Sequence, residues 1–577
     1  MNYANNASLR LKLEAWRARL MILVLMMSFV VLIGRAAYLQ GLNDDFLQQK
    51  GEARYGRVIE LPATRGMVMD RHGEPLAIST PVESIWASPE DVEMTPRQLD
   101  SLAKLLNLKA SEIRNKLKNE SRNFVFLKRQ IPPELASRVM SLNIPGVFQQ
   151  REYRRYYPAG EVMAHMVGFT SVDGVGQEGM ELAHQNWLTG KPGSRRVIKD
   201  RLGHIIEDAG SIRLPQQGKD LSLSIDAKLQ YLAYRELKAA VDANKAKGGA
   251  LVAIDAVTGE VLALVNQPDF NPNNRGKVTG EKTRNRSLTD TFEPGSTLKP
   301  LTAALALESG KYRPDTLIDT SEGRFSIYSA TIRDTHPDGD LTVAQVIQKS
   351  SNVGSAKIAL TIEPEKMWNL FNAVGFGSHP KTGFPGEATG KLRPYKSWRP
   401  IEQATMSYGH GISVSLLQLA RSYTIFTGDG GLRDLTFVKT NVPAPTTPVI
   451  SSQTAQSVRE MLELVTQPGG TAPRAAVPGY RVAGKTGTAH KQEGRGYAAK
   501  RYVSSFVGMA PASNPRLIIA VMIDEPGGNQ YYGGLVAAPV FSSVMGAALR
   551  MQGAPMDAPL LEAAQPLTSI PLVKEEG

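Results

Sequence analysis

A serine and a lysine three positions apart are the first residues in this sequence that could do chemistry together. Ser296 and Lys299 lie in the segment 293–300, directly before an apolar run that ends at Leu307. Such a run predicts a helix, and positions i and i+3 share a helix face. A serine hydroxyl is a poor nucleophile near neutral pH, whereas a deprotonated lysine can serve as its base. Pro300 has no N–H to donate to the carbonyl of Ser296, so we expect a distorted first turn.

A second segment could supply a hydroxyl and an amide to the same cleft. Ser350 and Asn352 lie in Lys349-Ser350-Ser351-Asn352-Val353-Gly354, after a predicted helical segment that begins at Asp340. In a turn, residues two apart can point the same way. Most turns of this composition are caps or loops, so this pattern alone carries little weight.

A third segment, Tyr480 to Ala489, is predicted to be an extended strand. In a strand, Lys485 and Gly487 face one side, and Thr486 and Thr488 face the other. Gly487 has no side chain, so we expect a substrate backbone to lie directly against it. A cation, hydroxyls and exposed edge amides suit a peptide with a free carboxylate, bound as an added strand.

Similar spacings occur elsewhere and have to be weighed against these three. Serine and lysine are also three apart at Ser101/Lys104 and at Ser378/Lys381, and most such pairs are solvated surface residues. Lys381-Thr382-Gly383 repeats the triplet of the third segment. Because Pro380 and Pro385 flank it, we expect an irregular loop there.

The N-terminus carries a predicted membrane anchor. Residues 20–39 are almost wholly apolar, long enough at about 1.5 Å per residue to span a bilayer core if Arg35 extends to the interface. Basic residues dominate positions 1–19, so we expect that segment in the cytoplasm and the rest of the chain outside. A cleaved signal peptide is the alternative, but Ala36-Ala37 behind Arg35 is a poor cleavage site. A helix buried in the core of a cytosolic protein is a still weaker alternative to the membrane anchor.

The remaining chain divides at a Pro- and Gly-containing stretch near Pro215 to Gly218. Before it, apolar periodicity over 97–142 predicts helices. The segments 65–73 and 154–200 are rich in glycine and arginine, and we interpret them as a scaffold and interaction surface. After it, we expect a short strand at 221–225, followed by a helix that Asp226 caps. Two strands joined near Thr258-Gly259 come next, and we expect them to begin a sheet that is completed far downstream.

Composition narrows the class of protein. The 577 residues hold no cysteine, which excludes disulfides, thiolate metal sites and a cysteine nucleophile. The formal net charge of +12 is compatible with binding to an anionic surface such as phospholipid or cell wall, although an ordinary solvated surface is the stronger explanation. No nucleic-acid-binding signature accompanies the charge.

Taken together, the three segments resemble a known family. Ser-x-x-Lys, Ser-x-Asn and Lys-Thr-Gly in this order are similar to the signature set of penicillin-binding proteins and serine β-lactamases. The anchor and the segments 65–73 and 154–200 resemble the pedestal of class B penicillin-binding proteins. The segments 292–300 and 349–354 resemble the cell-division (FtsI-type) transpeptidases among them.

The resemblance implies an α+β architecture. It comprises a transmembrane helix, an elongated α+β pedestal and a transpeptidase domain with an antiparallel sheet of about five strands, flanking helices and an all-helical subdomain. The expected boundaries are 1–19 for the cytoplasmic segment, 20–39 for the helix, 40–218 for the pedestal, 219–552 for the transpeptidase domain and 553–577 for a flexible or processed tail.

The resemblance also implies the reaction. The substrate would be a peptidoglycan stem peptide ending in D-Ala-D-Ala, with Ser296 as nucleophile and Lys299 as its base. Ser350 would pass a proton to the departing D-Ala, and Asn352 would orient Lys299 and the donor amide. A β-lactam would acylate Ser296 and remain there.

The same resemblance implies a carboxylate site and an oxyanion hole. Lys485, Thr486, Gly487 and Thr488 would bind the terminal carboxylate, and the backbone amides of Ser296 and Thr488 would bind the oxyanion. It implies no cofactor and no metal. The ligands would be stem peptides, their lipid-linked precursor and β-lactams. The protein partners would be an FtsW-type glycan polymerase and other division proteins. The location would be the inner membrane at the division septum.

Two histidines depart from the pattern of this family. His410 stands where related sequences usually carry an aromatic residue, and His336 lies near the expected cleft wall. Because histidine changes charge near pH 6 to 7, they could make acylation depend on pH, as in a specialised division paralogue. The plain alternative is two polar loop residues.

Two other functional classes share these motifs. A β-lactamase needs a second base for deacylation and rarely carries an anchor and pedestal. A β-lactam sensor needs an intracellular effector, for which the cytoplasmic segment is too short. A pure scaffold would not need Ser296.

Overall fold

The computed structural model describes residues 14–42, 56–118, 124–199, 205–276, 279–440, 442–494, 496–528 and 530–559. Most of the predicted cytoplasmic segment and tail therefore lies outside the described residues. Contacts divide the chain into two compact units. One comprises Met1–Ala63, Val82–Glu152 and Lys191–Gln217, and the other Thr64–Pro81, Tyr153–Gly190 and Gly218–Gly577. Two segments of the predicted pedestal, 64–81 and 153–190, thus belong to the second unit.

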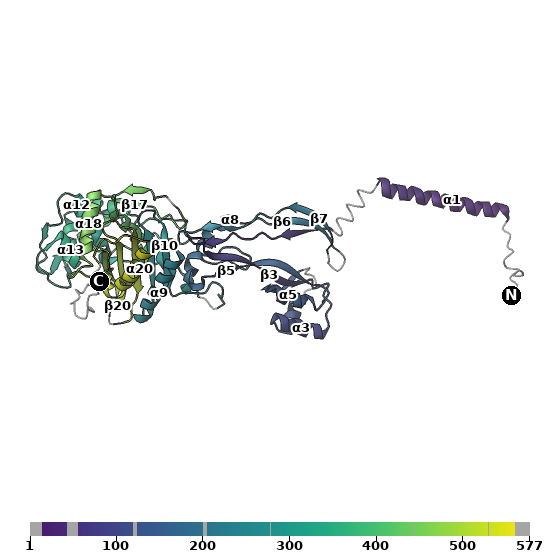
Figure 1. Cartoon of the computed structure of the whole chain (residues 1–577), viewed down its shortest axis with the longest axis horizontal. Coiled ribbons are helices and arrows are strands. Elements are labelled where there is room, and N and C mark those ends of the chain that lie inside the picture. Colours follow the sequence, from purple (N-terminus) through teal and green to yellow (C-terminus); the bar gives the residue numbers. More distant parts are fainter. Residues whose placement is uncertain are drawn as a thin grey trace. The chain divides into compact units, whose positions relative to one another are not determined.

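The N-terminal helix α1 (Ala15–Ala37) continues into a π-helical turn, η3 (Tyr38–Leu42), and forms one purple ribbon in Figure 1. The helical span Ala15–Gln40 has a mean hydropathy of 2.4 and buries no side chain within the protein. By length and composition it can cross a membrane, and it contains all of the predicted span 20–39.

The first unit contains an antiparallel three-stranded sheet and a small α+β core. The sheet has the order β1 (Gly56–Leu61), β6 (Gly193–Lys199), β7 (Ile205–Arg213), and β6 and β7 run as long neighbours in Figure 1. The α+β core contains α3 (Pro96–Leu106), α4 (Ala110–Leu117), β4 (Val125–Ile131) and α5 (Pro133–Met140). The prediction of helices over 97–142 was therefore wrong for β4, where Leu127 packs into the core as a strand residue.

Two strands, β3 (Pro75–Ala87) and β5 (Val147–Tyr156), have residues in both units and pair with each other. In the second unit, β2 (Val68–Met69) pairs with β3 and, in parallel, with β8 (Leu221–Ser222). A turn follows β2, in which Gly73 has a φ of 91°, a conformation that favours glycine.

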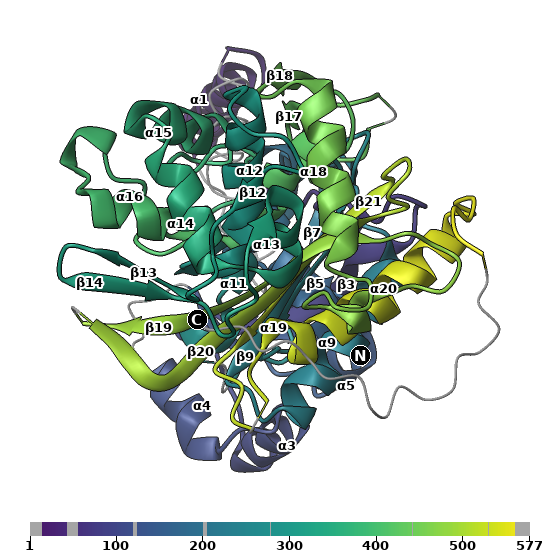
Figure 2. The ribbon, with the colours of Figure 1, turned by 90° about the vertical axis from the view of Figure 1, so that its left-hand side faces the viewer.

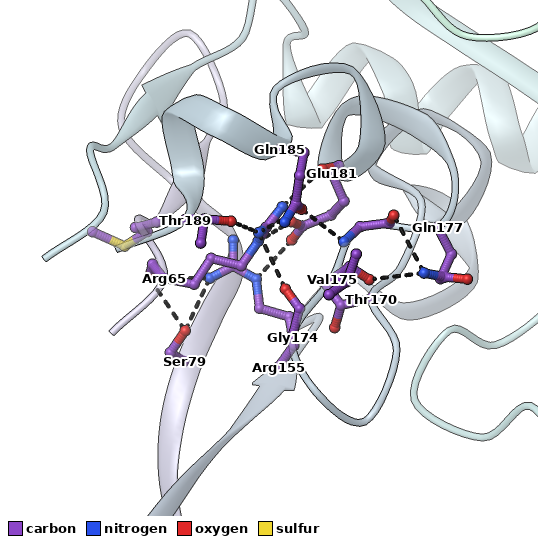
Figure 3. A network of polar contacts seen from close by, with 12 residues as sticks. Arg65, Ser79, Arg155, Thr170, Gly174, Val175, Gln177, Glu181, Gln185 and Thr189 are labelled. Carbon is purple, nitrogen blue, oxygen red and sulfur yellow. Dashed lines mark hydrogen bonds and ion pairs between the residues drawn. The ribbon is translucent and has the colours of Figure 1, made fainter. Parts of the chain in front are cut away.

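The two arginine-rich segments meet at one buried glutamate in the second unit (Figure 3). Both oxygens of Glu181, which is fully buried, bind guanidinium groups: Arg65 Nε at 2.5 Å and Arg155 Nε at 2.6 Å. Arg65 also donates to Gln185, and Arg155 donates to Ser79. Removing the one carboxylate would leave two largely buried cations, so this network stabilises the fold.

The C-terminal part of the second unit is built on a five-stranded antiparallel sheet, as predicted. Its order is β10 (Val261–Gln267), β9 (Gly248–Asp255), β21 (Leu517–Asp524), β20 (Gly496–Ala510) and β19 (Ala483–Glu493). Every residue of β21 is buried, so helices must cover both faces of the sheet. The predicted hairpin at Gly259 is confirmed, and it is β21, β20 and β19 from far downstream that complete the sheet.

Helices α9 (Ala227–Ala243) and α20 (Ala538–Met551) pack on each other and on the sheet, while α11 (Arg286–Thr289) and α17 (Leu416–Ser422) pack on β9. Asp226 caps α9 as predicted, since its side chain accepts from the amides of Lys228 and Leu229. In Figure 2, α9 and α20 lie on one side of the sheet, and most other helices of the second unit lie on its other side.

The helices on that other side form the expected subdomain, but it is not all-helical as predicted, because it also contains short strands. They are α12 (Lys299–Glu308), α13 (Val343–Lys349), α14 (Asn352–Leu360), α15 (Pro364–Ala373), α16 (Pro400–Met406) and α18 (Ser452–Leu464). The subdomain also carries two short pairs of strands: β12 (Leu317–Ile318) with β15 (Leu341–Thr342), and the hairpin of β13 (Arg324–Ile327) and β14 (Ala330–Arg333). In Figure 2 this hairpin and the β19–β20 hairpin project on the same side.

Candidate active site

Ser296 lies in a tight turn rather than in a regular helix. The 3-10 turn η5 (Gly295–Leu298) precedes α12, and the amide of Lys299 donates to the carbonyl of Ser296. Pro300 occupies one of the first two positions of α12, where its missing N–H costs nothing. The predicted distortion at the nucleophile is therefore confirmed. The turn is also held from outside, since the hydroxyl of the fully buried Tyr423 donates to the carbonyl of Thr297 at 2.7 Å.

Lys299 is fully buried and its amine lies between two hydroxyls. Its Nζ is 2.9 Å from Ser296 Oγ and 3.0 Å from Ser350 Oγ, and it also contacts the carbonyl of Ser350. The predicted i,i+3 meeting of Ser296 and Lys299 is confirmed. The amine is within direct reach of the proton that Ser296 must lose.

Ser350 connects the first lysine to the second. It ends α13 with a φ of 62°, a left-handed conformation that is rare for a residue with a side chain. Its Oγ accepts from Lys299 Nζ and, at 2.9 Å, from Lys485 Nζ. Strained backbone of this kind is often found where a side chain must be aimed. Ser296, Lys299, Ser350 and Lys485 thus form one continuous chain of contacts.

The strand β19 places the triplet as alternation predicts. Lys485 reaches into the site, while Thr486 and Thr488 engage other partners: Thr486 Oγ1 lies 2.8 Å from Thr471 Oγ1, and Thr488 Oγ1 accepts from the amide of Gly533 at 3.0 Å. Lys485 Nζ is also 3.3 Å from Thr486 Oγ1. The hydroxyls that the family resemblance assigns to carboxylate binding are therefore held in place by the protein.

The reason for a glycine at 487 differs from the prediction. A Cβ added to Gly487 would meet Ser505 Oγ at 2.6 Å, the carbonyl of Pro294 at 2.8 Å and Thr297 Cγ2 at 2.9 Å. It is the nucleophile segment, and not a substrate backbone, that lies against this glycine. The absent side chain lets β19 approach η5, which brings the backbone of Thr488 towards that of Ser296.

Asn352 begins α14, and its side-chain amide donates to the carbonyl of Arg333 at 3.2 Å. Its contact with Lys299 stays a prediction. Asp334, which the sequence did not single out, holds Ser351 and the first turn of α14. Its carboxylate accepts from Ser351 Oγ at 2.5 Å, from the amide of Asn352 at 2.5 Å and from the amide of Val353 at 3.0 Å. The only sequence signal was an aspartate shortly before the motif, and no spacing rule connects the two.

The repeated triplet at Lys381 is a loop, as predicted. Lys381 has a φ of 59°, and Thr382 binds Glu387 through its amide and its hydroxyl. None of the contacts described for Ser296 involves these residues.

The pH hypothesis for His410 was wrong for the range considered. Burial, together with the charges of Lys299 and His490, lowers the pKa of His410 to about 4. With its pKa lowered in this way, the ring does not change charge near pH 6 to 7, as the hypothesis required. His336 is exposed.

Among the described residues, no three histidine or acidic side chains gather in a way that could hold a metal ion. A serine in a tight turn, a buried lysine on it, and a second serine and lysine closing the chain instead define a serine acyl-transfer site of the penicillin-recognising class.

Comparison with known proteins agrees with this class. A family model described as "Penicillin binding protein transpeptidase domain" matches residues 249–546, and one described as "Penicillin-binding Protein dimerisation domain" matches residues 60–223. The chain belongs to the penicillin-binding protein transpeptidases of the class B type.

Several relatives match over nearly the whole chain. A probable peptidoglycan D,D-transpeptidase PenA of Neisseria gonorrhoeae is 43% identical over 552 residues, covering 95% of each chain. The peptidoglycan D,D-transpeptidase FtsI of Escherichia coli K12 is 41% identical, covering 94% of this chain and 93% of its own.

Solved structures match either the C-terminal part or most of the chain. The apo transpeptidase domain of Burkholderia pseudomallei penicillin-binding protein 3 has 53% identity and a TM-score of 0.55, covering 58% of this chain and 98% of its own. A peptidoglycan synthetase of Bifidobacterium adolescentis has a TM-score of 0.69 at 24% identity and covers 90% of this chain and 99% of its own, which supports the fold alone.

Proposed function

We propose that this chain is a D,D-transpeptidase that crosslinks peptidoglycan stem peptides at the division septum, and that β-lactams inhibit it by acylating Ser296. The observation that carries the proposal is the buried chain of contacts from Ser296 Oγ through Lys299 Nζ and Ser350 Oγ to Lys485 Nζ. The relatives named as peptidoglycan D,D-transpeptidases support the substrate class.

In acylation, Lys299 takes the proton of Ser296 as Oγ attacks the carbonyl of the penultimate D-Ala. The backbone amides of Ser296 and Thr488 bind the oxyanion, a contact whose loss typically costs about 100- to 1,000-fold in rate. As the peptide bond breaks, Ser350 passes a proton to the amine of the leaving D-Ala. Asn352 orients the donor amide.

The terminal carboxylate of the donor binds at Lys485 with Thr486 and Thr488, beside Gly487. An amine of a second stem peptide then attacks the acyl carbonyl, which releases Ser296 and forms the crosslink. A β-lactam follows the first step only, because its opened ring stays attached and blocks the second amine.

The proposed placement in the cell follows from the anchor. Positions 1–19 lie in the cytoplasm, 20–39 cross the inner membrane, 40–218 form the pedestal and 219–552 the catalytic domain in the periplasm, with 553–577 as a tail. An FtsW-type glycan polymerase is the partner that a transpeptidase of this kind requires for new strands.

Labelling with a fluorescent penicillin and mapping the modified peptide tests the proposal. We expect the label on Ser296, no label on Ser296→Ala, and normal labelling of Ser378→Ala, whose serine has the same spacing to a lysine. Label on another residue would refute the site. Rapid loss of the label from Ser296 would instead identify a β-lactamase, and full complementation of a division mutant by Ser296→Ala would identify a scaffold.

A further inference from the structure

Glu293, three residues before the nucleophile, is a buried carboxylate that the mechanism does not use. It is only 5% exposed, and its Oε1 accepts three hydrogen bonds. The donors are the amide of Gly411 at 2.8 Å, Gln492 Nε2 at 2.7 Å and the hydroxyl of Tyr497 at 3.2 Å. One oxygen atom therefore joins the nucleophile segment to two other parts of the chain.

Two of these donors face each other near the end of the β19–β20 hairpin. Gln492 and Tyr497 are cross-strand partners, beyond a register shift between His490 and Gln492. β20 pairs with β21 only from Val503 onward, so this end of the hairpin is a two-stranded extension of the sheet, visible at the left of Figure 2. Because an isolated two-stranded ribbon is marginally stable in water, the extension needs an anchor.

The third donor belongs to the turn that closes the other side of the nucleophile. The carbonyl of Gly409 accepts from the amide of Gly295, and a Cβ at Gly409 would lie 2.2 Å from the carbonyl of Gly295. Gly411, two residues later, is the residue whose amide binds Glu293. The carboxylate thus fastens both segments that border η5.

Aromatic contacts extend this junction to the catalytic lysine. The ring of Tyr497 lies 6.1 Å from that of His410, which lies 5.2 Å from that of Tyr408. The Nζ of Lys299 is 6.0 Å from the centre of the Tyr408 ring. A shift of Tyr497 would therefore reach the surroundings of Lys299 through two packed rings.

The arrangement is costly for stability alone. The second oxygen of Glu293, Oε2, is buried and has no hydrogen-bond partner among the residues that the structure describes. Burial raises the pKa of Glu293 above its usual value, which reflects the same cost. A buried carboxylate with an unsatisfied oxygen in a native site calls for a reason other than folding.

We infer that Glu293 is a positioning residue for the acylation of Ser296, holding the end of the β19–β20 hairpin and the Gly411 turn against the nucleophile segment. This inference rests on the proposed function, in which Ser296 is acylated. Glu293 acts through Gln492 and Tyr497 and does not itself touch the reacting atoms.

A double-mutant cycle on the acylation rate tests this inference. The second-order rate constant for a fluorescent penicillin is measured for wild type, Glu293→Ala, Gln492→Ala/Tyr497→Phe, and the triple variant. Hydrogen bonds to a charged group are roughly twice as strong as neutral ones, so we expect Glu293→Ala to slow acylation by about 10- to 100-fold. In the Gln492→Ala/Tyr497→Phe background, we expect Glu293→Ala to cost at least about threefold less than it does in wild type, because only the hydrogen bond from the amide of Gly411 then remains to be lost.

Three further measurements separate positioning from general destabilisation. Glu293→Gln keeps an acceptor oxygen without the charge and should lose less than Glu293→Ala. Amide hydrogen exchange should rise at residues 496–502 in Glu293→Ala and not in β9. The control, Glu463→Ala, removes another buried carboxylate, one that binds Arg481 away from the site, and should acylate at the wild-type rate.

The outcomes distinguish a failure of the proposed function from a failure of the positioning role of Glu293. Wild type that is not labelled overturns the proposed function and this inference with it. Wild type that is labelled normally, with Glu293→Ala at the same rate or with additive losses in the cycle, overturns this inference alone. If Glu293→Ala does not fold, Gln492→Ala/Tyr497→Phe decides, and a rate equal to that of wild type refutes the positioning role.

Discussion

Replacing Asp334 by asparagine is the most direct test of how the second motif is held. The carboxylate accepts three hydrogen bonds, from Ser351 Oγ and from the amides of Asn352 and Val353. It also lies at the N-terminus of α14, where a negative charge is favourable. Asparagine keeps the shape and one acceptor oxygen, but it removes the charge and turns a donor towards Ser351.

The size of the effect follows from these contacts. A hydrogen bond to a charged group contributes about 1.5–3 kcal/mol, and a carboxylate at a helix N-terminus adds about 0.3–1 kcal/mol. Since asparagine retains part of both, we expect a loss of about 2 kcal/mol in holding the motif. If that loss falls on the arrangement of Ser350 and Asn352 needed for reaction, acylation slows by roughly thirtyfold at about 1.4 kcal/mol per factor of ten.

The measurement is the second-order acylation rate of the purified protein with a fluorescent penicillin, alongside urea unfolding to verify the fold. Asp319→Asn is the matched control, because Asp319 is an exposed aspartate of the same subdomain that binds Ser321 and Lys357. We expect it to react like wild type. An Asp334→Asn variant that acylates within about twofold of wild type would refute the reasoning, since the charge-assisted contacts would then be irrelevant to the site.

Three further predictions concern the surroundings of the site and the fold. Tyr423→Phe removes the hydroxyl that binds the carbonyl of Thr297. We therefore expect the free energy of unfolding in urea to fall by about 1–2 kcal/mol and acylation to slow severalfold. Unchanged acylation would show that η5 keeps its conformation without this hydrogen bond. Burial lowers the pKa of His165 to about 4, whereas the unfolded chain titrates near 6.5. The unfolded state therefore binds more protons between these values, and the stability present above pH 6.5 falls by up to about 3 kcal/mol as the pH drops to 4. His165→Asn should flatten that slope in urea titrations at several pH values, and an unchanged slope would contradict the assignment. Glu181→Gln leaves its two arginine partners without a counter-charge and should cost about 3–5 kcal/mol, with a loss below about 1 kcal/mol in urea showing that the network is dispensable.

Several features of this protein could be predicted from local sequence. The apolar run of α1, the alternation in β19 and the i,i+3 spacing of Ser296 and Lys299 are short-range patterns, and each predicts its element because side-chain direction follows backbone period. The proline at 300 predicted the distorted turn for the same kind of reason, since a missing N–H acts within four residues.

Other predictions failed where the surroundings decide. Gly487 was expected to leave room for substrate, whereas the segment that contains Pro294 fills that space. His410 was expected to titrate near neutral pH, but burial beside Lys299 lowers its pKa to about 4. Adjacent residues in the chain do not predict which segment packs against a glycine, and they do not predict how deeply a histidine is buried.

The sequence by itself thus determined an N-terminal apolar helix long enough to cross a membrane, the order of the elements and the three motifs that indicate the chemistry. Only the tertiary structure decided what holds those motifs in place. Ser351 donates a hydrogen bond to Asp334, and Tyr423 donates one to the carbonyl of Thr297. Tyr497 donates one to Glu293, which lies 204 positions earlier in the chain. The physical reason is that a hydrogen bond between distant segments depends on how sheets and helices pack, and such a contact has no period or spacing in the sequence.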